Sequence, residues 1–111
     1  MKFAFDKDPI ILQEYSSEFD NIRKKMIMTS YYKYGPARDN FGSGRVDAFA
    51  SAEKCMSAFK KDGNTEHLAD AANYLMFRFK FPYPGECYRP TSSEECVPPV
   101  GEPINQSKNI Y

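Results

Sequence analysis

The sequence predicts an all-α fold with three main helices, followed by an extended tail. The stretch from Thr65 to Phe81 carries apolar residues on nearly all sides of a helix and is followed by Pro82, which ends it. Two earlier stretches repeat apolar residues every three or four positions, which is the helical period. Six of the eight prolines lie in residues 82–111, a spacing that neither a helix nor a sheet strand tolerates. We therefore expect a helical domain over residues 1–81 and a Pro-rich extended tail over residues 82–111.

The composition fits one small domain and excludes several function classes. With 111 residues, the chain can form one modest core and one site or binding face. Fifteen basic and fifteen acidic residues cancel, so no overall charge attracts nucleic acid or an anionic membrane. No stretch reaches the roughly 18 to 20 apolar residues of a membrane span, and the N-terminus lacks the pattern of a signal peptide. We expect a cytoplasmic protein that contacts neither membrane nor nucleic acid.

The N-terminal third is expected to contribute one helix. Phe3 and Phe5 alternate with other residues, and Asp8-Pro9 starts a short apolar run, so residues 1–14 are predicted to be an extended or irregular lead-in. Ser16 or Ser17 can cap a helix, because its hydroxyl can accept from an unpaired backbone N–H. The apolar residues that follow recur at spacings of four, three and four: Tyr15, Phe19, Ile22 and Met26. This pattern predicts a first helix from Ser17 to Thr29.

A long loop is predicted from Ser30 to Arg45. Gly35-Pro36 is a turn signal, and further turn-forming residues follow it closely. Long ordered loops in small domains are often functional. Four rings of this segment could stack on a base or on a side chain of a partner, and three cations lie beside them: Tyr31, Tyr32, Tyr34 and Phe41, with Lys33, Arg38 and Arg45. The alternative is that these rings cover the exposed end of the core.

The second and third helices are predicted to form an antiparallel hairpin. From Val46 to Lys61, one side is apolar and carries Phe49, Ala52, Met56 and Phe59. Gly63 and Asn64 then provide a stop, and Thr65 can cap the third helix. Such a short link places two helices side by side. Because the third helix is apolar on nearly all sides, we expect it to be central.

One stripe of the third helix holds the candidate chemical groups. Glu66, Asp70, Asn73 and Phe77 are three or four residues apart and share one face. No basic residue adjoins Asp70, and burying an unpaired carboxylate is costly. A hydrogen bond from Asn73 or from a tyrosine hydroxyl would make this carboxylate structural. The alternative is a divalent cation, because Glu53, Glu66 and Asp70 supply the oxygen ligands that Mg²⁺ prefers.

The cysteines and the tail leave further alternatives open. The three cysteines include no CxxC pair, and with a single histidine they cannot complete a familiar zinc site. In a reducing cytosol we expect free thiols, with a bridge between Cys87 and Cys96 as the alternative. His67 is expected to be an exposed residue of a first helical turn. The tail has anchors that would lie on the helices or on a partner: Phe81, Tyr83, Tyr88, Val97, Val100 and Ile104.

The third helix resembles a known enzyme family. HLADAANYLMF is similar to the second metal-binding helix of the MazG-like all-α NTP pyrophosphatases, which carries a Glu-x-x-Asp pattern. Asp70 matches the family's aspartate and Asn73 its following asparagine. His67 stands at the glutamate position, Glu66 is one residue out of register, and the preceding helix offers Glu53 alone. The resemblance implies Mg²⁺-dependent pyrophosphohydrolysis of nucleotides across a homodimer, or a degenerate relative that binds nucleotides without cleaving them.

A second resemblance covers more of the chain. The segments that carry it are KYGP, the loop into RVDAF, AEKCM, GNTEHLADAANYLMFRF and the Pro-rich ending. These look like small proteins of phages and prophages. The resemblance implies an accessory role in which the protein covers the active surface of a host factor, such as a nuclease of a CRISPR or other defence system. Such an inhibitor needs aromatic anchors and a charged rim, with no catalytic residue, metal or cofactor.

Our leading expectation is therefore non-catalytic binding to a host protein, of an anti-defence type. The expected contact residues are Tyr31, Tyr32, Tyr34, Arg38, Phe41, Tyr83 and Tyr88. The alternative is a Mg²⁺-dependent nucleotide pyrophosphohydrolase, in which Glu53, Glu66, Asp70 and Asn73 surround the metal and the phosphates.

Overall fold

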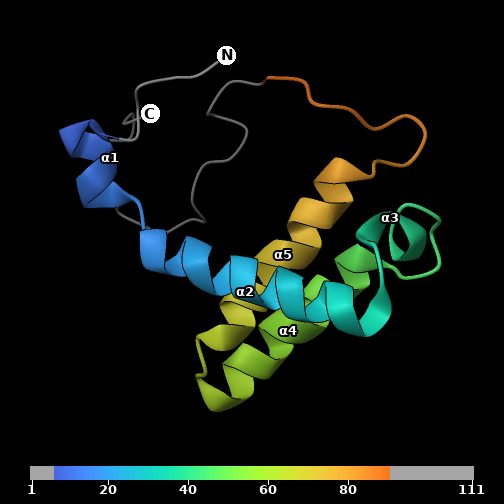
Figure 1. Ribbon diagram of the computed structural model, residues 1–111, viewed down its shortest axis with the longest axis horizontal. Coiled ribbons are helices and arrows are strands. Elements are labelled where there is room, and N and C mark those ends of the chain that lie inside the picture. Colours follow the sequence, from blue (N-terminus) through green and yellow to red (C-terminus); the bar gives the residue numbers. More distant parts are fainter. Residues whose placement is uncertain (1–6, 91–111) are drawn as a thin grey trace, which may run out of the picture.

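The computed structural model describes residues 7–90, and this part of the chain contains five helices and no strand. The helices are α1 (Pro9–Glu14), α2 (Ser17–Tyr34), α3 (Ala37–Asn40), α4 (Ala48–Asp62) and α5 (Glu66–Lys80). The predicted all-α class with three main helices is confirmed, because α2, α4 and α5 dominate the fold. Figure 1 shows α4 and α5 side by side and antiparallel, with α2 lying across them.

The turn between α4 and α5 makes the hairpin, and its predicted stop is confirmed. Gly63 ends α4 with a φ of 69°, a left-handed conformation that glycine adopts without a Cβ penalty. Thr65 is the N-cap residue of α5, as predicted, but its φ and ψ are helical and its hydroxyl does not make the predicted capping bond. Asn64 performs that role instead, since its Oδ1 accepts from the Glu66 backbone N–H at 3.0 Å.

Three helix boundaries in the N-terminal half differ from the predictions. Residues Pro9–Glu14 form α1 rather than an irregular lead-in, because Asp8 accepts from the Ile10 N–H at 2.8 Å and proline suits a first helical turn. Helix α2 continues beyond Thr29 to Tyr34, and Gly35 ends it with a φ of 86°. The short α3 lies inside the segment predicted to be a loop. The turn signals of this segment begin at Gly35-Pro36, so the helix continues through residues 30–34 and ends where the first of these signals stands.

The most buried apolar side chains of the hairpin are alanines. Ala48 and Ala52 of α4 and Ala69 and Ala71 of α5 are at most 4% exposed, and in the described residues no larger apolar side chain reaches that burial. Small side chains allow two helix axes to approach closely. The core is thin as a result, because an alanine removes little apolar area from water.

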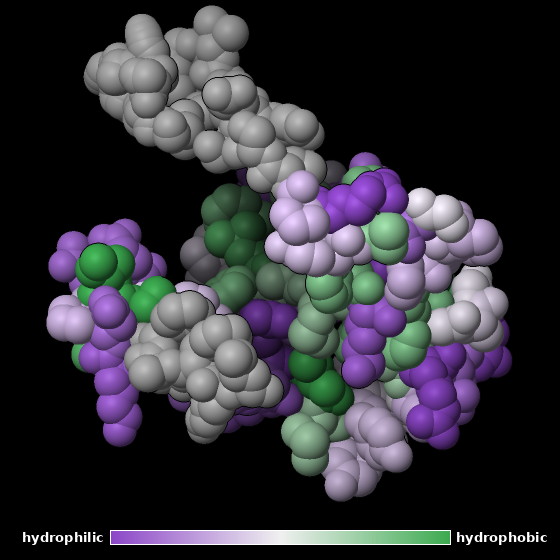
Figure 2. Space-filling view, turned by 90° about the horizontal axis from the view of Figure 1, so that it is seen from above, coloured by the Kyte–Doolittle hydropathy of each residue, from purple (hydrophilic) through white to green (hydrophobic). Residues whose placement is uncertain are grey.

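Helix α5 is central, but it is not covered on all sides as its composition suggested. Leu68, Leu75 and Phe79 share one face and are 37%, 41% and 71% exposed. Figure 2 shows other hydrophobic side chains at the surface, for example on α1 at the left of the view. There, Ile10 and Leu12 are exposed. Only one of the two apolar sides of α5 is therefore used within the described part of the chain.

A polar interlock joins α2 to α5. The Asn73 side chain is buried, its Oδ1 accepts from Arg23 Nε at 2.9 Å, and its Nδ2 donates to the Arg23 backbone carbonyl at 3.1 Å. Arg23 also donates to the Met76 sulfur and pairs with Asp20. The Asn73 amide binds Arg23 through both its side chain and its main chain, and these two bonds fix the position of α2 along the hairpin.

After α5 the chain turns back without helix or strand up to residue 90, as the Pro-rich composition predicts. The Glu86 N–H donates to the Tyr83 carbonyl at 3.0 Å, and the Tyr83 N–H donates to the Glu86 carboxylate at 2.9 Å. The remaining predicted anchors, Val97, Val100 and Ile104, lie outside the described residues, as do Cys96, Phe3 and Phe5. No helix within residues 7–90 has both the length and the apolar character needed to cross a membrane.

Candidate functional site

Two of the predicted site residues line one cavity. Asp70 and Asn73 of α5 face a space of about 290 Å³ that is closed by α2 and by the segment between α2 and α4. We call it the Asp70 cavity. Its other lining residues are mostly apolar or aromatic: Met26, Ile27, Ser30, Tyr34, Asn40, Phe41, Val46, Tyr74 and Phe77. Three of the rings form a cluster, in which Phe41 stacks on Phe77 at 4.7 Å and meets Tyr74 edge-on at 5.9 Å.

Asp70 is half-buried and has one hydrogen-bond donor in the described structure. The Cys55 thiol of α4 donates to Asp70 Oδ2 at 3.6 Å, a weak bond, and no Lys or Arg pairs with the carboxylate there. The expected bond from Asn73 or a tyrosine does not form. Desolvation, followed by the Asp70 charge, raises the pKa of the Cys55 thiol. Desolvation and then the same carboxylate also raise the pKa of the Tyr74 hydroxyl.

The other predicted metal ligands lie apart from Asp70. Glu53 is exposed and lines a shallow depression on the outer side of α4, among Ala50, Lys54 and Lys61. Glu66 is exposed in the first turn of α5. Within residues 7–90, no three His, Cys, Asp or Glu side chains gather closely enough to hold a metal ion. A single chain therefore brings together Asp70 and Asn73, and it leaves Glu53 and Glu66 outside.

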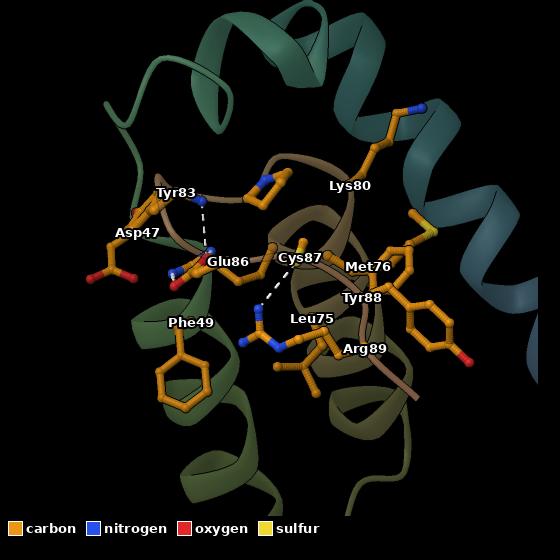
Figure 3. A pocket seen from close by; sticks show the side chains of 13 residues that line it. Asp47, Phe49, Leu75, Met76, Lys80, Tyr83, Glu86, Cys87, Tyr88 and Arg89 are labelled. Carbon is orange, nitrogen blue, oxygen red and sulfur yellow. Dashed lines mark hydrogen bonds and ion pairs between the residues drawn. The ribbon is translucent and has the colours of Figure 1, made fainter. Parts of the chain in front are cut away.

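A larger groove lies beside the free face of α5. It has a volume of about 1360 Å³ and is lined by the end of α5, by the start of α4 and by the returning segment. We call it the hairpin groove; its apolar and aromatic lining consists of Phe49, Leu75, Met76, Phe79, Pro82, Tyr83 and Tyr88. Figure 3 shows Phe49 of α4 and Leu75 of α5 projecting side by side from neighbouring helices.

An ion pair and a stacked ring hold the returning segment against α5. Arg78 forms a bidentate pair with Glu86, and its guanidinium lies 3.6 Å from the centroid of the Tyr83 ring. The bond to Glu86 raises the pKa of Arg78, and the bonds from Arg78 and from the Tyr83 N–H lower the pKa of Glu86. Such a planar, two-bond pair restricts geometry more than a single contact does. It fixes one wall of the hairpin groove.

The charges around the hairpin groove leave a positive excess. Three basic and two acidic side chains line it: Asp47, Arg78, Lys80, Glu86 and Arg89. Asp47 also caps α4 by accepting from the Ala50 N–H at 3.0 Å, and Arg78 pairs with Glu86. Lys80 and Arg89 also line the groove, and neither has an acidic partner among residues 7–90. Arg89 donates to the Cys87 sulfur, as the dashed line in Figure 3 shows.

The aromatic residues predicted in the loop divide into two groups. Tyr31, Tyr32 and Tyr34 belong to the end of α2 and are 53%, 79% and 67% exposed. The Arg38 side chain is also exposed. Phe41 instead packs inward on Phe77, where it closes the Asp70 cavity. The rings at the end of α2 are exposed and could contact a partner, whereas Phe41 covers the core. Each of the two alternatives predicted for this segment therefore applies to different residues.

Sequence reasoning missed the main residues of the hairpin groove. Phe49, Leu75 and Phe79 were assigned to apolar helix faces and not to a site. A signal was present, because the third helix has more apolar residues than one buried face needs, and Leu75 and Phe79 fall on its second face. Two predicted residues, Tyr83 and Tyr88, do lie in the groove.

Comparisons with protein-family models, with curated proteins and with solved structures gave no match for this chain.

Proposed function

We propose that this is a small non-catalytic binding protein, which docks an apolar segment of a partner protein into the hairpin groove. The observation that carries the proposal is the groove itself, which measures about 1360 Å³ and is lined by Leu75 and Phe79, 41% and 71% exposed. This volume exceeds the range of about 300 to 1,000 Å³ that is usual for small-molecule pockets. A helix or an extended peptide carries enough apolar side chains to fill it.

The chemistry of the groove defines the partner segment. Aromatic and long apolar side chains are the groups that carry most binding energy at protein interfaces. Phe49, Phe79 and Tyr88 are each more than half exposed, so burying them would remove substantial apolar area from water. Because Lys80 and Arg89 leave a positive excess at the rim, the segment should be apolar with at least one acidic residue beside its apolar anchors.

A host protein as the partner is supported by the resemblance to small phage and prophage proteins. Phage accessory proteins of this kind act by covering a functional surface of a host factor. Under this proposal the function is inhibition by occlusion, and the defence nucleases of the host are the first partners to test. The groove needs no catalytic group for this role.

The test uses two matched variants of exposed aromatic residues. Phe79→Asp puts a negative charge in the lining of the groove, while Tyr32→Asp makes the same kind of change on α2, where the side chain is 79% exposed. Both should fold, because exposed substitutions usually change stability by about 0.5 kcal/mol or less. A host protein captured by the native chain is purified, and its affinity for each chain is measured by calorimetry. We expect Phe79→Asp to weaken binding about 30-fold or more, and Tyr32→Asp to leave it within twofold. Equal binding by Phe79→Asp would overturn the proposal.

The nucleotide alternative has one supporting observation, the shared cavity of Asp70 and Asn73. A single chain leaves Glu53 and Glu66 away from it, so this reaction would need ligands from a second copy. A thermal-shift panel of Mg²⁺ or Mn²⁺ with each nucleoside triphosphate tests it, because a ligand at 100 times its dissociation constant adds about 2.7 kcal/mol of stability. A metal-dependent shift that Asp70→Ala abolishes would favour the enzyme. The proposed binding function predicts no shift across the panel.

A further inference from the structure

A carboxylate without a cationic partner faces the Asp70 cavity. One oxygen of Asp70 accepts only the weak bond from the Cys55 thiol, at 3.6 Å, and no hydrogen bond to the other is present in the described structure. No lysine or arginine lines the cavity among the described residues. Two cations of α2 contact lining residues of the cavity: Arg23 binds Asn73 and pairs with Asp20, and Lys33 lies 5.6 Å from the Tyr34 ring centroid. Neither forms an ion pair with Asp70. The cavity therefore carries one negative charge that the described chain does not neutralise.

The walls around this charge are apolar, aromatic or neutral. Phe41, Tyr74 and Phe77 form the ring cluster, and Ile27 and Val46 add aliphatic surface. In such surroundings the attraction between a carboxylate and a cation is stronger than in water. Aromatic rings also attract organic cations through the negative potential of their faces. A hydrated metal ion gains little from these walls, whereas an alkylammonium can contact them with its carbon chain.

We propose that the Asp70 cavity is a binding site for a small organic ammonium group, with Asp70 as its counterion and the Phe41, Tyr74 and Phe77 rings as its walls. The cavity, at about 290 Å³, lies at the lower end of the usual range for small-molecule pockets and suits a short amine. The inference does not rest on the hairpin groove, since none of the three rings and neither Asp70 nor Asn73 lines that groove. The ammonium group could come from a free amine or from a lysine of a partner protein.

The first test compares a charged probe with its neutral counterpart on the native chain. The isotope-labelled full-length protein is titrated with n-butylammonium chloride and, separately, with 1-butanol, at constant ionic strength. Amide shifts in the NMR spectrum report binding at Ile27, Asp70 and Tyr74. We expect butylammonium to bind at least tenfold more tightly than butanol at these residues. Equal affinity would mean that the cavity is merely apolar and would overturn the proposal.

Two variants assign the charge that is responsible. Asp70→Asn keeps the shape of the side chain but removes its charge, so the advantage of butylammonium over butanol should disappear. Glu66→Gln is the matched control on the same helix, because Glu66 is exposed and does not line the cavity. It should keep the full tenfold preference. A loss of the preference in both variants, or in neither, contradicts the assignment to Asp70. The comparison in the native chain stands even if Asp70→Asn proves unstable.

A third probe identifies the source of the ammonium group. Nα-acetyl-lysine methylamide presents the same ammonium on a peptide-like stem. Binding at least as tight as that of butylammonium would support a lysine of a partner protein. Exclusion of this probe, with butylammonium still bound, would support a free amine.

Discussion

At the residue scale, Asn73 shows how one buried amide positions a helix. Its Oδ1 accepts from the Arg23 side chain and its Nδ2 donates to the Arg23 main chain, so Arg23 satisfies both polar atoms of the buried amide. Sequence reasoning placed Asn73 among the candidate ligands because it follows Asp70 by three residues. In the structure Asn73 joins α5 to α2. Its bonding partner, Arg23, lies fifty residues earlier, so no sequence spacing reveals this joining role.

Asn73→Ala should destabilise the fold by about 1 to 3 kcal/mol, because it removes both hydrogen bonds between the buried Asn73 amide and the partly buried Arg23. For a domain of this size, that corresponds to a fall in melting temperature of roughly 4 to 8 °C for each kcal/mol. Chemical denaturation followed by circular dichroism measures it. Asn21→Ala is the matched control, since Asn21 is exposed on the same helix α2. A loss as small as in the control would mean that the interlock does not stabilise the fold.

Cys55 gives a second prediction at this scale, through its thiol pKa. Burial and then the Asp70 charge raise that pKa, so at pH 8 a smaller fraction of Cys55 is thiolate, the reactive form. Iodoacetamide should therefore modify the exposed Cys87 well before Cys55, as mass spectrometry of the peptides would show. Asp70→Asn removes one cause of the shift and should speed the reaction of Cys55 without changing that of Cys87. Equal rates at the two cysteines in the native chain would contradict this account.

At the scale of elements, local signals predicted the hairpin well and the N-terminal half less well. Gly63 and Asn64 mark the turn in the sequence, and both act as stop and cap signals in the structure. Helix α2 was predicted too short although Gly35-Pro36, its true stop, is visible in the sequence. The predicted loop began five residues before this stop, although the turn-forming residues lie only from Gly35 onward. Helix α1 was missed because an apolar run of three residues is ambiguous until the bond from Asp8 is known.

The segment after α5 depends on the pair between Arg78 and Glu86. Because the folded pKa of Glu86 is lowered, this pair stabilises the segment above the ordinary glutamate pKa of about 4.5, and its contribution is lost as pH falls through the lowered value. The amide shift of Tyr83, whose N–H donates to Glu86, should titrate with a midpoint below 4.5. Glu86→Gln should abolish this titration and speed amide exchange at Tyr83. A midpoint at or above 4.5 would show that the pair does not hold the segment.

At the scale of the whole molecule, the thin core and the hairpin groove have a common origin. Helix α5 has two apolar sides, and the described part of the chain covers one of them with α2 and with the alanines of α4. The other side leaves Leu68, Leu75 and Phe79 in contact with solvent. The sequence shows that both sides are apolar, but it does not show which one α2 covers. Long-range contacts decide this, and with them the location of the candidate binding surface.

The central claim is that a partner protein occupies the hairpin groove and leaves the tyrosines of α2 free. Amide hydrogen exchange of the full-length chain, alone and with a purified partner, tests it most directly. The account predicts slower exchange in residues 75–89, which include the end of α5 and the segment held by Glu86. Peptides that cover Tyr31, Tyr32 and Tyr34 should exchange at an unchanged rate. Protection of these tyrosines with no change in residues 75–89 would contradict the account and move the binding surface to the end of α2.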